Sequence, residues 1–238
     1  MQKNRVLYKQ SRGFRMIKAV IFDFDGLILD TESPEFQAWQ EVFTEHGQEL
    51  GIDLWADLIG RPRTYFDMYA YFKELNGPST DIDSLRKKRR ARTVELVLSQ
   101  PVLPGVQDYL ISARQSDLKI GLASNSGGDY VRGHLKRLEL FEYFHSTRCF
   151  EDTDLHKPDP TPYLAVLGDL GVLPSEAVAF EDSPNGVTAA RAAGIYCVAV
   201  PNPITRYLPL EHADRRIDSL ADEPLSQLLW RAAETAKR

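Results

Sequence analysis

The chain has few cysteines, no long apolar run and no excess of basic residues. Its two cysteines, Cys149 and Cys197, show no CxxC spacing, which excludes a disulfide framework and favours a reduced, cytoplasmic setting. No uninterrupted apolar run approaches the roughly 18 residues that a membrane span needs, so we expect no membrane partner. The net charge of -5 argues against a nucleic-acid partner, which usually needs a basic face.

The apolar content is nevertheless sufficient for a large core. The 238 residues are 43% hydrophobic, enough for one core or for a core and a smaller domain. Residues 1–15 stand apart, because they are basic and polar and lack the apolar centre of a secretory signal. We interpret them as a mobile basic extension or the result of a start codon assigned too early. A targeting or binding arm is the alternative.

Short apolar runs alternate with helical patterns along most of the chain. The runs at 18–24, 119–123, 177–180 and 196–200 are continuous, which is typical of strands buried on both faces of a parallel sheet. Apolar residues at i, i+3, i+4 spacing predict helices over 105–116, 130–138, 161–170 and 185–193. This order predicts an α/β fold with a mostly parallel sheet and right-handed crossovers.

One long segment breaks this alternation. From residue 33 to residue 99 the pattern is amphipathic and helical, with no convincing strand, and the segment is too long for a loop. We predict that 33–99 form a small helical domain, a lid, inserted into a core domain made of 16–32 and 100–238. We expect a monomer, because both cores need the apolar residues that the sequence offers.

Reactive side chains follow the predicted strands at the points where the strands end. They are Asp23, Asp25, Ser124, Asn125, Glu181 and Asp182, and Lys157 lies in the sequence between the second and third predicted strands. In open α/β sheets, ligands bind beyond the carboxyl ends of the strands. Carboxylates suit Mg²⁺, which usually takes one or two of them together with phosphate and water. Ser124, the N-terminus of the following helix and Lys157 suit a phosphate. The sequence therefore predicts a Mg²⁺ cofactor and a small phosphorylated metabolite.

The two aspartates of DFDG suit covalent catalysis. Asp23, beside the metal, could attack phosphorus and form an acyl phosphate. Asp25 points roughly the same way in an extended segment, so it could protonate the leaving oxygen and later activate water. Gly26 allows the chain to turn away sharply. A lone DxD is more often a solvated turn, but the other side chains at the strand ends are hard to explain structurally.

Four motifs in order resemble the haloacid dehalogenase superfamily, and within it the β-phosphoglucomutase-like branch with a helical cap. The motifs are DFDGLILDTE (23–32), ASNS (123–126), KPDP (157–160) and FEDS (180–183). The resemblance implies a Rossmann-like, doubly wound core. It also implies that Asp23 is the nucleophile and Asp25 the general acid and base.

The same resemblance implies a set of ligand contacts. Ser124 and Lys157 would hold the transferring phosphate, with Asn125 as a further donor. Mg²⁺ would be bound by Asp23, the backbone carbonyl of Asp25, Asp182 and additionally Glu181. These four Mg²⁺ ligands and the three phosphate contacts complete the core site that the resemblance implies.

The helical segment carries two further candidates. LIGRPRTYF resembles the loop that binds the substrate phosphate in this branch, with Arg63 as the contact, although a surface ion pair is an equal alternative for Arg63. The run RKKRRAR (86–92) is interpreted as a solvated helix face. The alternative is that Lys88 or a neighbour reaches a distal phosphate of the substrate.

The departures from the family motifs decide between reactions. Dehalogenases lack the second aspartate, so Asp25 favours phosphoryl transfer over carbon–halogen cleavage. β-Phosphoglucomutases have a histidine where DTESPEFQAW places Glu35, which favours a phosphatase for a small phosphomonoester such as a sugar phosphate over a mutase. A receiver-like, phospho-accepting signalling module is the alternative of another class. Asp25 and the long helical insertion oppose it.

Overall fold

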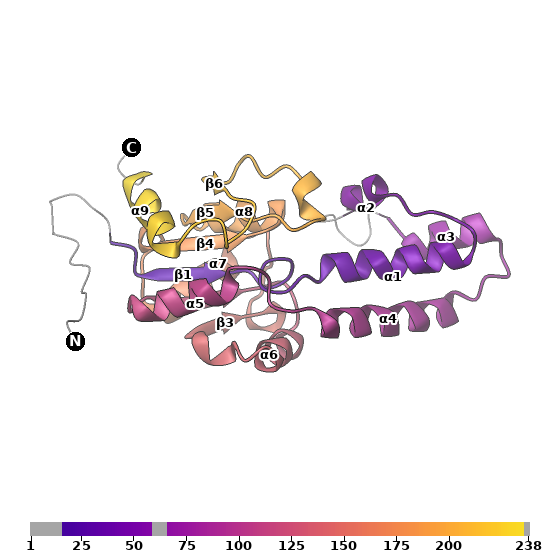
Figure 1. The fold of residues 1–238 in the computed structure, drawn as a ribbon, viewed down its shortest axis with the longest axis horizontal. Coiled ribbons are helices and arrows are strands. Elements are labelled where there is room, and N and C mark those ends of the chain that lie inside the picture. Colours follow the sequence, from indigo (N-terminus) through magenta and orange to yellow (C-terminus); the bar gives the residue numbers. More distant parts are fainter. Residues whose placement is uncertain (1–15, 59–65, 236–238) are drawn as a thin grey trace.

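The structure is a computed structural model that describes residues 16–58 and 66–235 (Figure 1). The interpretation of residues 1–15 and the prediction for Arg63 lie outside these ranges. In the described part, six strands form one sheet in the order β3-β2-β1-β4-β5-β6, and every neighbouring pair is parallel. The strands are β1 (Ala19–Phe22), β2 (Lys119–Ala123), β3 (Ser146–Arg148), β4 (Ala177–Glu181), β5 (Tyr196–Ala199) and β6 (Arg215–Arg216).

Helices account for most of the remaining chain. The α-helices are α1 (Glu32–Glu45), α2 (Ile52–Leu58), α3 (Met68–Asn76), α4 (Ile82–Ser99), α5 (Val106–Gln115), α6 (Gly128–Arg137), α7 (Thr161–Leu170), α8 (Pro184–Ala192) and α9 (Leu225–Thr235). Four short 3-10 helices are η1 (Phe141–Tyr143), η2 (Phe150–Asp152), η3 (Pro174–Glu176) and η4 (Thr205–Tyr207).

Alternate residues of each strand face opposite helical layers. Val20 and Phe22 of β1 belong to the hydrophobic cluster that includes residues of α5, α6 and α9. Ala19 and Ile21 belong to a second cluster with residues of α7 and α8. Because side chains alternate across a strand, burial on both faces requires a continuous apolar run. The predicted doubly wound α/β fold is thereby confirmed.

Two strands and one helix were not expected from the sequence. The short strands β3 and β6 lie at the two edges of the sheet, and α9 packs on the same face as α5. The other predicted elements are present, with ends shifted by one or two residues. For example, the run at 18–24 forms a strand over Ala19–Phe22, because the chain turns after the strand.

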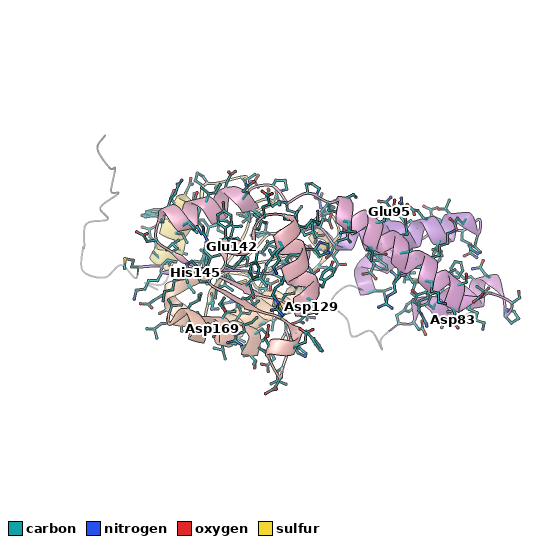
Figure 2. All side chains as sticks on the ribbon, turned by 90° about the horizontal axis from the view of Figure 1, so that it is seen from below. Asp83, Glu95, Asp129, Glu142, His145 and Asp169 are labelled. Atoms are coloured by element: carbon teal, nitrogen blue, oxygen red, sulfur yellow. The ribbon has the colours of Figure 1, made fainter. Side chains whose placement is uncertain are left out.

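The helices α1 to α4 lie between β1 and α5 in the sequence and extend away from the sheet (Figure 1). They share a hydrophobic cluster that includes Trp39, Phe43 and Phe72 and that also takes in Ile204 from the loop after β5. Asp83, near the start of α4, lies at the end remote from the sheet, and Glu95 lies nearer to it (Figure 2). We refer to residues 32–99 as the helical segment.

Two short stretches connect the helical segment to the sheet and pair with each other. Leu29 forms an antiparallel bridge with Val102, and the amide of Leu103 donates to the carbonyl of Ile28 at 3.0 Å. The two connections therefore lie side by side at the edge where β1 ends. Among the described residues, we find no helix with the length and apolarity needed to cross a membrane.

Candidate active site

The predicted reactive residues meet at the carboxyl ends of β1, β2 and β4. Phe22, the last residue of β1, lies beside Leu122 of β2 and Phe180 of β4. The next residues of the three strands therefore emerge together, which places Asp23 beside Glu181. Parallel strands that share a register bring their ends to one edge, as the sequence predicts.

Lys157 connects three elements at this edge. Its Nζ donates to Asp23 Oδ1 at 2.6 Å, to Glu181 Oε1 at 2.6 Å and to the carbonyl of Ala123 at 2.7 Å. Burial alone would lower the pKa of this lysine, but the two carboxylates outweigh burial and raise its pKa above the ordinary value. Lys157 is therefore charged, and all three of its N–H donors are occupied.

Asp23, Glu181 and Asp182 form a buried cluster of carboxylates whose oxygen atoms lie within 4.8 Å of one another. Burial, with the nearby Asp23 carboxylate, raises the pKa of Glu181 to about 7. Burial, Asp23 and Glu181 together raise the pKa of Asp182 well above its ordinary value. One lysine does not neutralise three buried acids, and an oxygen-only donor set is the kind that hard divalent cations prefer. The cluster therefore fits a divalent metal ion.

Asp25 lies just beyond this cluster and is partly buried. Its Oδ2 accepts from Ser124 Oγ at 3.4 Å, and it also takes hydrogen bonds from Ser126 and Thr31. Burial, followed by the charge of Asp23, raises the pKa of Asp25 to about 6, although the hydrogen bonds oppose the rise. Asp25 can therefore hold or release a proton near neutral pH.

Ser124 lies at the site, but the helix that follows is already capped. Ser124 is buried, and its Oγ accepts from the amide of Ser126 at 2.9 Å. The amide of Gly128 at the start of α6 donates to Glu151 Oε2 at 2.8 Å, and this bond lowers the pKa of Glu151. A carboxylate from η2 thus occupies the Gly128 amide, and the binding of phosphate at this helix N-terminus stays a prediction.

Asn125 contacts the backbone of Lys157 with both ends of its amide. Its Oδ1 accepts from the Lys157 amide at 2.9 Å, and its Nδ2 donates to the Lys157 carbonyl at 3.0 Å. The sequence suggested a phosphate donor at this position. In the structure, Asn125 fixes the loop that carries the lysine to the loop that carries Ser124, and its role as a phosphate donor stays a prediction.

Two buried polar residues of the site were not predicted from the sequence. Tyr163 of α7 is fully buried and donates its hydroxyl to Glu181 Oε1 at 2.5 Å. Asn202, in the loop after β5, donates from Nδ2 to Asp182 Oδ2 at 2.8 Å. Applying the strand-end rule to the last predicted strand, as to the first three, would have pointed to Asn202.

Within the helical segment, the basic run is mostly exposed, but Arg89 and Arg92 are partly buried, and Arg92 donates to both carboxylate oxygens of Glu41, at 2.8 and 3.0 Å. The side chain of Arg89 is 11% exposed and donates to Glu35 Oε1 at 3.2 Å. Lys88 pairs with Glu45 at 2.6 Å, in the last turn of α1 and away from the sheet (Figure 1). The solvated-face interpretation therefore fails for Arg89, because its side chain packs between α1 and α3.

Comparisons with known proteins agree with this geometry. Residues 20–200 match the family "Haloacid dehalogenase-like hydrolase". The "Putative phosphatase YhcW" of Bacillus subtilis is 44% identical over 214 residues, which cover 90% of this chain and 97% of that protein. Hexitol phosphatase B of Escherichia coli K12 is 32% identical and covers 90% of this chain and 98% of that protein.

A solved structure gives the same result for the fold. The crystal structure of β-phosphoglucomutase from Clostridium difficile superposes with a TM-score of 0.71 at 25% identity, covering 94% of this chain and 100% of that one. The chain belongs to the haloacid dehalogenase-like hydrolase family. Within this family it is a phosphoric monoester hydrolase, a phosphatase.

Proposed function

We propose that the protein is a Mg²⁺-dependent phosphatase that hydrolyses a small sugar phosphate through an aspartyl phosphate on Asp23. The observation that carries this proposal is the set of contacts around Asp23. This carboxylate is buried, is held by Lys157 at 2.6 Å, and lies in a cluster with two further acids. A sugar phosphate is the substrate class because one relative is a hexitol phosphatase.

The metal would be held by Asp23, Asp182 and the backbone carbonyl of Asp25, with Glu181 as an additional ligand. Both oxygens of Glu181 already accept hydrogen bonds, Oε1 from Lys157 and Tyr163 and Oε2 from Ser183 Oγ at 3.4 Å, so Glu181 would give up one of these bonds to contact the metal. When bound, Mg²⁺ would offset the negative charge that builds up on the phosphoryl oxygens. Nucleophilic attack and proton transfer would be carried out by side chains of this chain.

In the first step, a carboxylate oxygen of Asp23 attacks phosphorus and the bond from phosphorus to the leaving oxygen breaks. Asp25, in its protonated form, gives its proton to that oxygen, so the sugar leaves as a neutral alcohol. Ser124 Oγ lies next to Asp25 and would donate to the phosphoryl group. Lys157 has no uncommitted donor, so it would contact phosphate by transferring its bond from Asp23 Oδ1.

In the second step, water attacks the phosphorus of the aspartyl phosphate. Asp25, now a carboxylate, takes a proton from that water, phosphate leaves, and the Asp23 carboxylate is restored. One group can serve both steps because its pKa of about 6 lets both protonation states be populated near neutral pH.

We further propose that residues 33–99 act as a cap over this site. The paired connections at Leu29 and Val102 offer a narrow attachment about which the segment could rotate. Closure during the first step would exclude bulk water, and opening would admit the water that completes the second step. Arg63 would contact the substrate phosphate from this cap.

The test is phosphate release from a panel of sugar phosphates and other small phosphomonoesters in Mg²⁺, with β-glucose 1-phosphate included. Wild-type protein should release phosphate repeatedly, and Asp23→Asn should lose turnover while keeping its far-ultraviolet circular dichroism. A folded Asp23→Asn variant with normal activity would refute the nucleophile. Asn125→Asp and Asn125→Ala serve as controls that alter the site without removing a proposed reacting group.

Two other outcomes would identify other functions. Conversion of β-glucose 1-phosphate to glucose 6-phosphate with little free phosphate would show a mutase in which Glu35 replaces the family histidine. A single phosphorylation from a small donor without turnover would show a receiver-like module. Repeated release of free phosphate contradicts both.

A further inference from the structure

Asn202 lies where the loop after β5 meets the carboxylate cluster. Both Asn202 and Asp182 are buried, with 4% and 3% of their surfaces exposed. The side-chain Nδ2 donates to Asp182 Oδ2 at 2.8 Å and to the carbonyl of Gly26 at 3.4 Å. One amide group therefore connects the turn after β1 with the acid that follows β4.

The orientation of the Asn202 amide is set by its own loop. Its Oδ1 accepts from the amides of Ile204 and Thr205, at 2.8 and 2.9 Å. Backbone amides can only donate, so the oxygen must face them and the nitrogen must face Asp182. The donor that Asp182 receives is thus fixed by the backbone and is not free to flip.

The turn at Gly26 packs tightly against this pair. Gly26 has a φ of +76°, and a Cβ on it would lie 2.2 Å from Asp182 Oδ2 and 2.5 Å from Asn202 Nδ2. The Gly26 backbone therefore approaches the Asp182 carboxylate closely, at a position where only glycine fits. The hydrogen bond from Asn202 holds Asp182 Oδ2 at this place.

The same loop reaches the helical segment. Ile204, two residues after Asn202, is 4% exposed and belongs to the hydrophobic cluster of that segment, with Trp39 and Trp55. Figure 1 shows the chain after β5 extending toward α2. The loop therefore has one residue on the carboxylate cluster and another in the core of the helical segment.

We propose that Asn202 is a positioning residue, which holds the Asp182 carboxylate in the orientation that binds the metal. Ile204, two residues further on, packs in the helical segment and thereby couples the position of Asn202 to that segment. The proposal rests on the proposed function, which supplies the metal. Residues that orient metal ligands typically change metal affinity by about 10–100-fold when they are removed. Packing of the helical segment would thereby influence the metal site through the loop 202–204.

The test is Mg²⁺ binding to the full chain, measured by calorimetry without substrate, together with the Mg²⁺ dependence of phosphate release. Asn202→Ala should raise the Mg²⁺ dissociation constant by about tenfold or more. Much of its kcat should return at saturating Mg²⁺. Asn125→Ala is the matched control, because Asn125 is also a site asparagine but contacts Lys157. It should lower kcat with a Mg²⁺ dissociation constant within about twofold of the wild type.

Ile204→Ala should weaken Mg²⁺ binding in the same direction as Asn202→Ala but by a smaller factor. Equal Mg²⁺ affinity in Ile204→Ala and wild type would overturn the link to the helical segment. Equal affinity in a folded Asn202→Ala variant would overturn the positioning role. Wild-type protein that binds Mg²⁺ but releases no phosphate would instead refute the proposed function, so the two failures are distinguishable.

A measurement on the wild type keeps the proposal testable if Asn202→Ala does not fold. The side-chain amide resonances of Asn202 should shift on Mg²⁺ titration and exchange slowly with solvent. Those of Asn76, which donates to Gln48 and to the carbonyl of Phe72 in the helical segment, should not shift. Unshifted Asn202 resonances at saturating Mg²⁺ would overturn the positioning role.

Discussion

Glu35 in the first turn of α1 and Arg89 in the middle of α4 are joined by an ion pair of 3.2 Å. The guanidinium of Arg89 also lies 5.0 Å from the ring of Trp39, and its Nε donates to the hydroxyl of Tyr69 at 2.9 Å. Its side chain is 11% exposed, whereas that of Glu35 is 43% exposed. One arginine of a basic run therefore stabilises the packing of the helical segment.

This difference in burial predicts different costs for the two partners. Arg89→Ala should lower the free energy of unfolding by about 1–3 kcal/mol, because it removes packing on Trp39 and a hydrogen bond to Tyr69. Glu35→Ala should cost less than about 1 kcal/mol, since exposed ion pairs contribute little. Urea unfolding measures both, with the exposed Arg90→Ala as the control from the same run. A larger loss for Glu35→Ala would contradict this interpretation.

The core strands could be predicted because burial on both faces of a strand requires a continuous run of apolar residues. β1, β2, β4 and β5 are covered on both faces, so each must be apolar at successive positions. β3 and β6 lie at the edges and consist of Ser-Thr-Arg and Arg-Arg. Their extended form comes from pairing with a neighbour, which leaves no periodic signal in the sequence.

The side chains that follow the strands were predictable, but their hydrogen-bond partners were not. Asp23, Lys157 and Asp182 belong to recognisable motifs, and the structure places them at one edge. Tyr163 and Asn202 appear in the sequence as a helix aromatic and a turn residue. Their contacts depend on how α7 and the loop after β5 pack against β4, and this packing is set by tertiary structure.

If Mg²⁺ is bound as proposed, its removal should abolish activity without unfolding the protein. Asp23, Glu181 and Asp182 repel one another, but the hydrophobic clusters on both faces of the sheet do not depend on them. In excess chelator we expect loss of phosphate release and unchanged far-ultraviolet circular dichroism, with activity restored by added MgCl₂. Full activity in excess chelator would refute the metal role.

Added Mg²⁺ should also raise the thermal stability of the protein. Mg²⁺ at about 100 times its dissociation constant should stabilise the folded state by about 2.7 kcal/mol, because it binds the assembled site. A rise in the melting temperature of the wild type on adding Mg²⁺ measures this effect. Asp182→Asn, which removes one proposed ligand, is the control and should show a smaller rise at the same Mg²⁺ concentration.

The raised pKa of Asp25 predicts a specific pH dependence of stability in the metal-free protein. The folded state binds this proton more tightly than the unfolded state, because burial and the Asp23 charge raise the pKa to about 6. The contribution of Asp25 is therefore favourable below the ordinary carboxyl pKa and is lost as the pH rises through 6. The loss amounts to at most about 1.4 kcal/mol per pH unit in that window.

Comparison with Asp25→Asn isolates the contribution of Asp25 protonation to the free energy of unfolding, because asparagine does not titrate. Urea unfolding in chelator between pH 4 and pH 7 should show the variant gaining stability relative to the wild type as the pH rises. The gain should fall short of the full value because Asp25 is only partly buried. A difference that stays constant over this range would show that Asp25 has an ordinary pKa.

Two glycines with nearly the same positive φ angle allow backbone strain to be separated from disruption of the site. Gly26 has a φ of +76° and Gly47 a φ of +72°, and a Cβ on Gly47 would meet nothing within 4 Å. Gly47→Ala should therefore cost about 1–2 kcal/mol of stability, from the left-handed backbone alone, and leave Mg²⁺ binding unchanged.

Gly26→Ala carries similar backbone strain and in addition forces Asp182 or Asn202 to move, since a Cβ would lie 2.2 and 2.5 Å from their polar atoms. Calorimetry on both variants should show loss of Mg²⁺ affinity for Gly26→Ala alone. Equal affinities would mean that the Asp182 carboxylate tolerates displacement, and that the tight packing of this turn does not control the metal site.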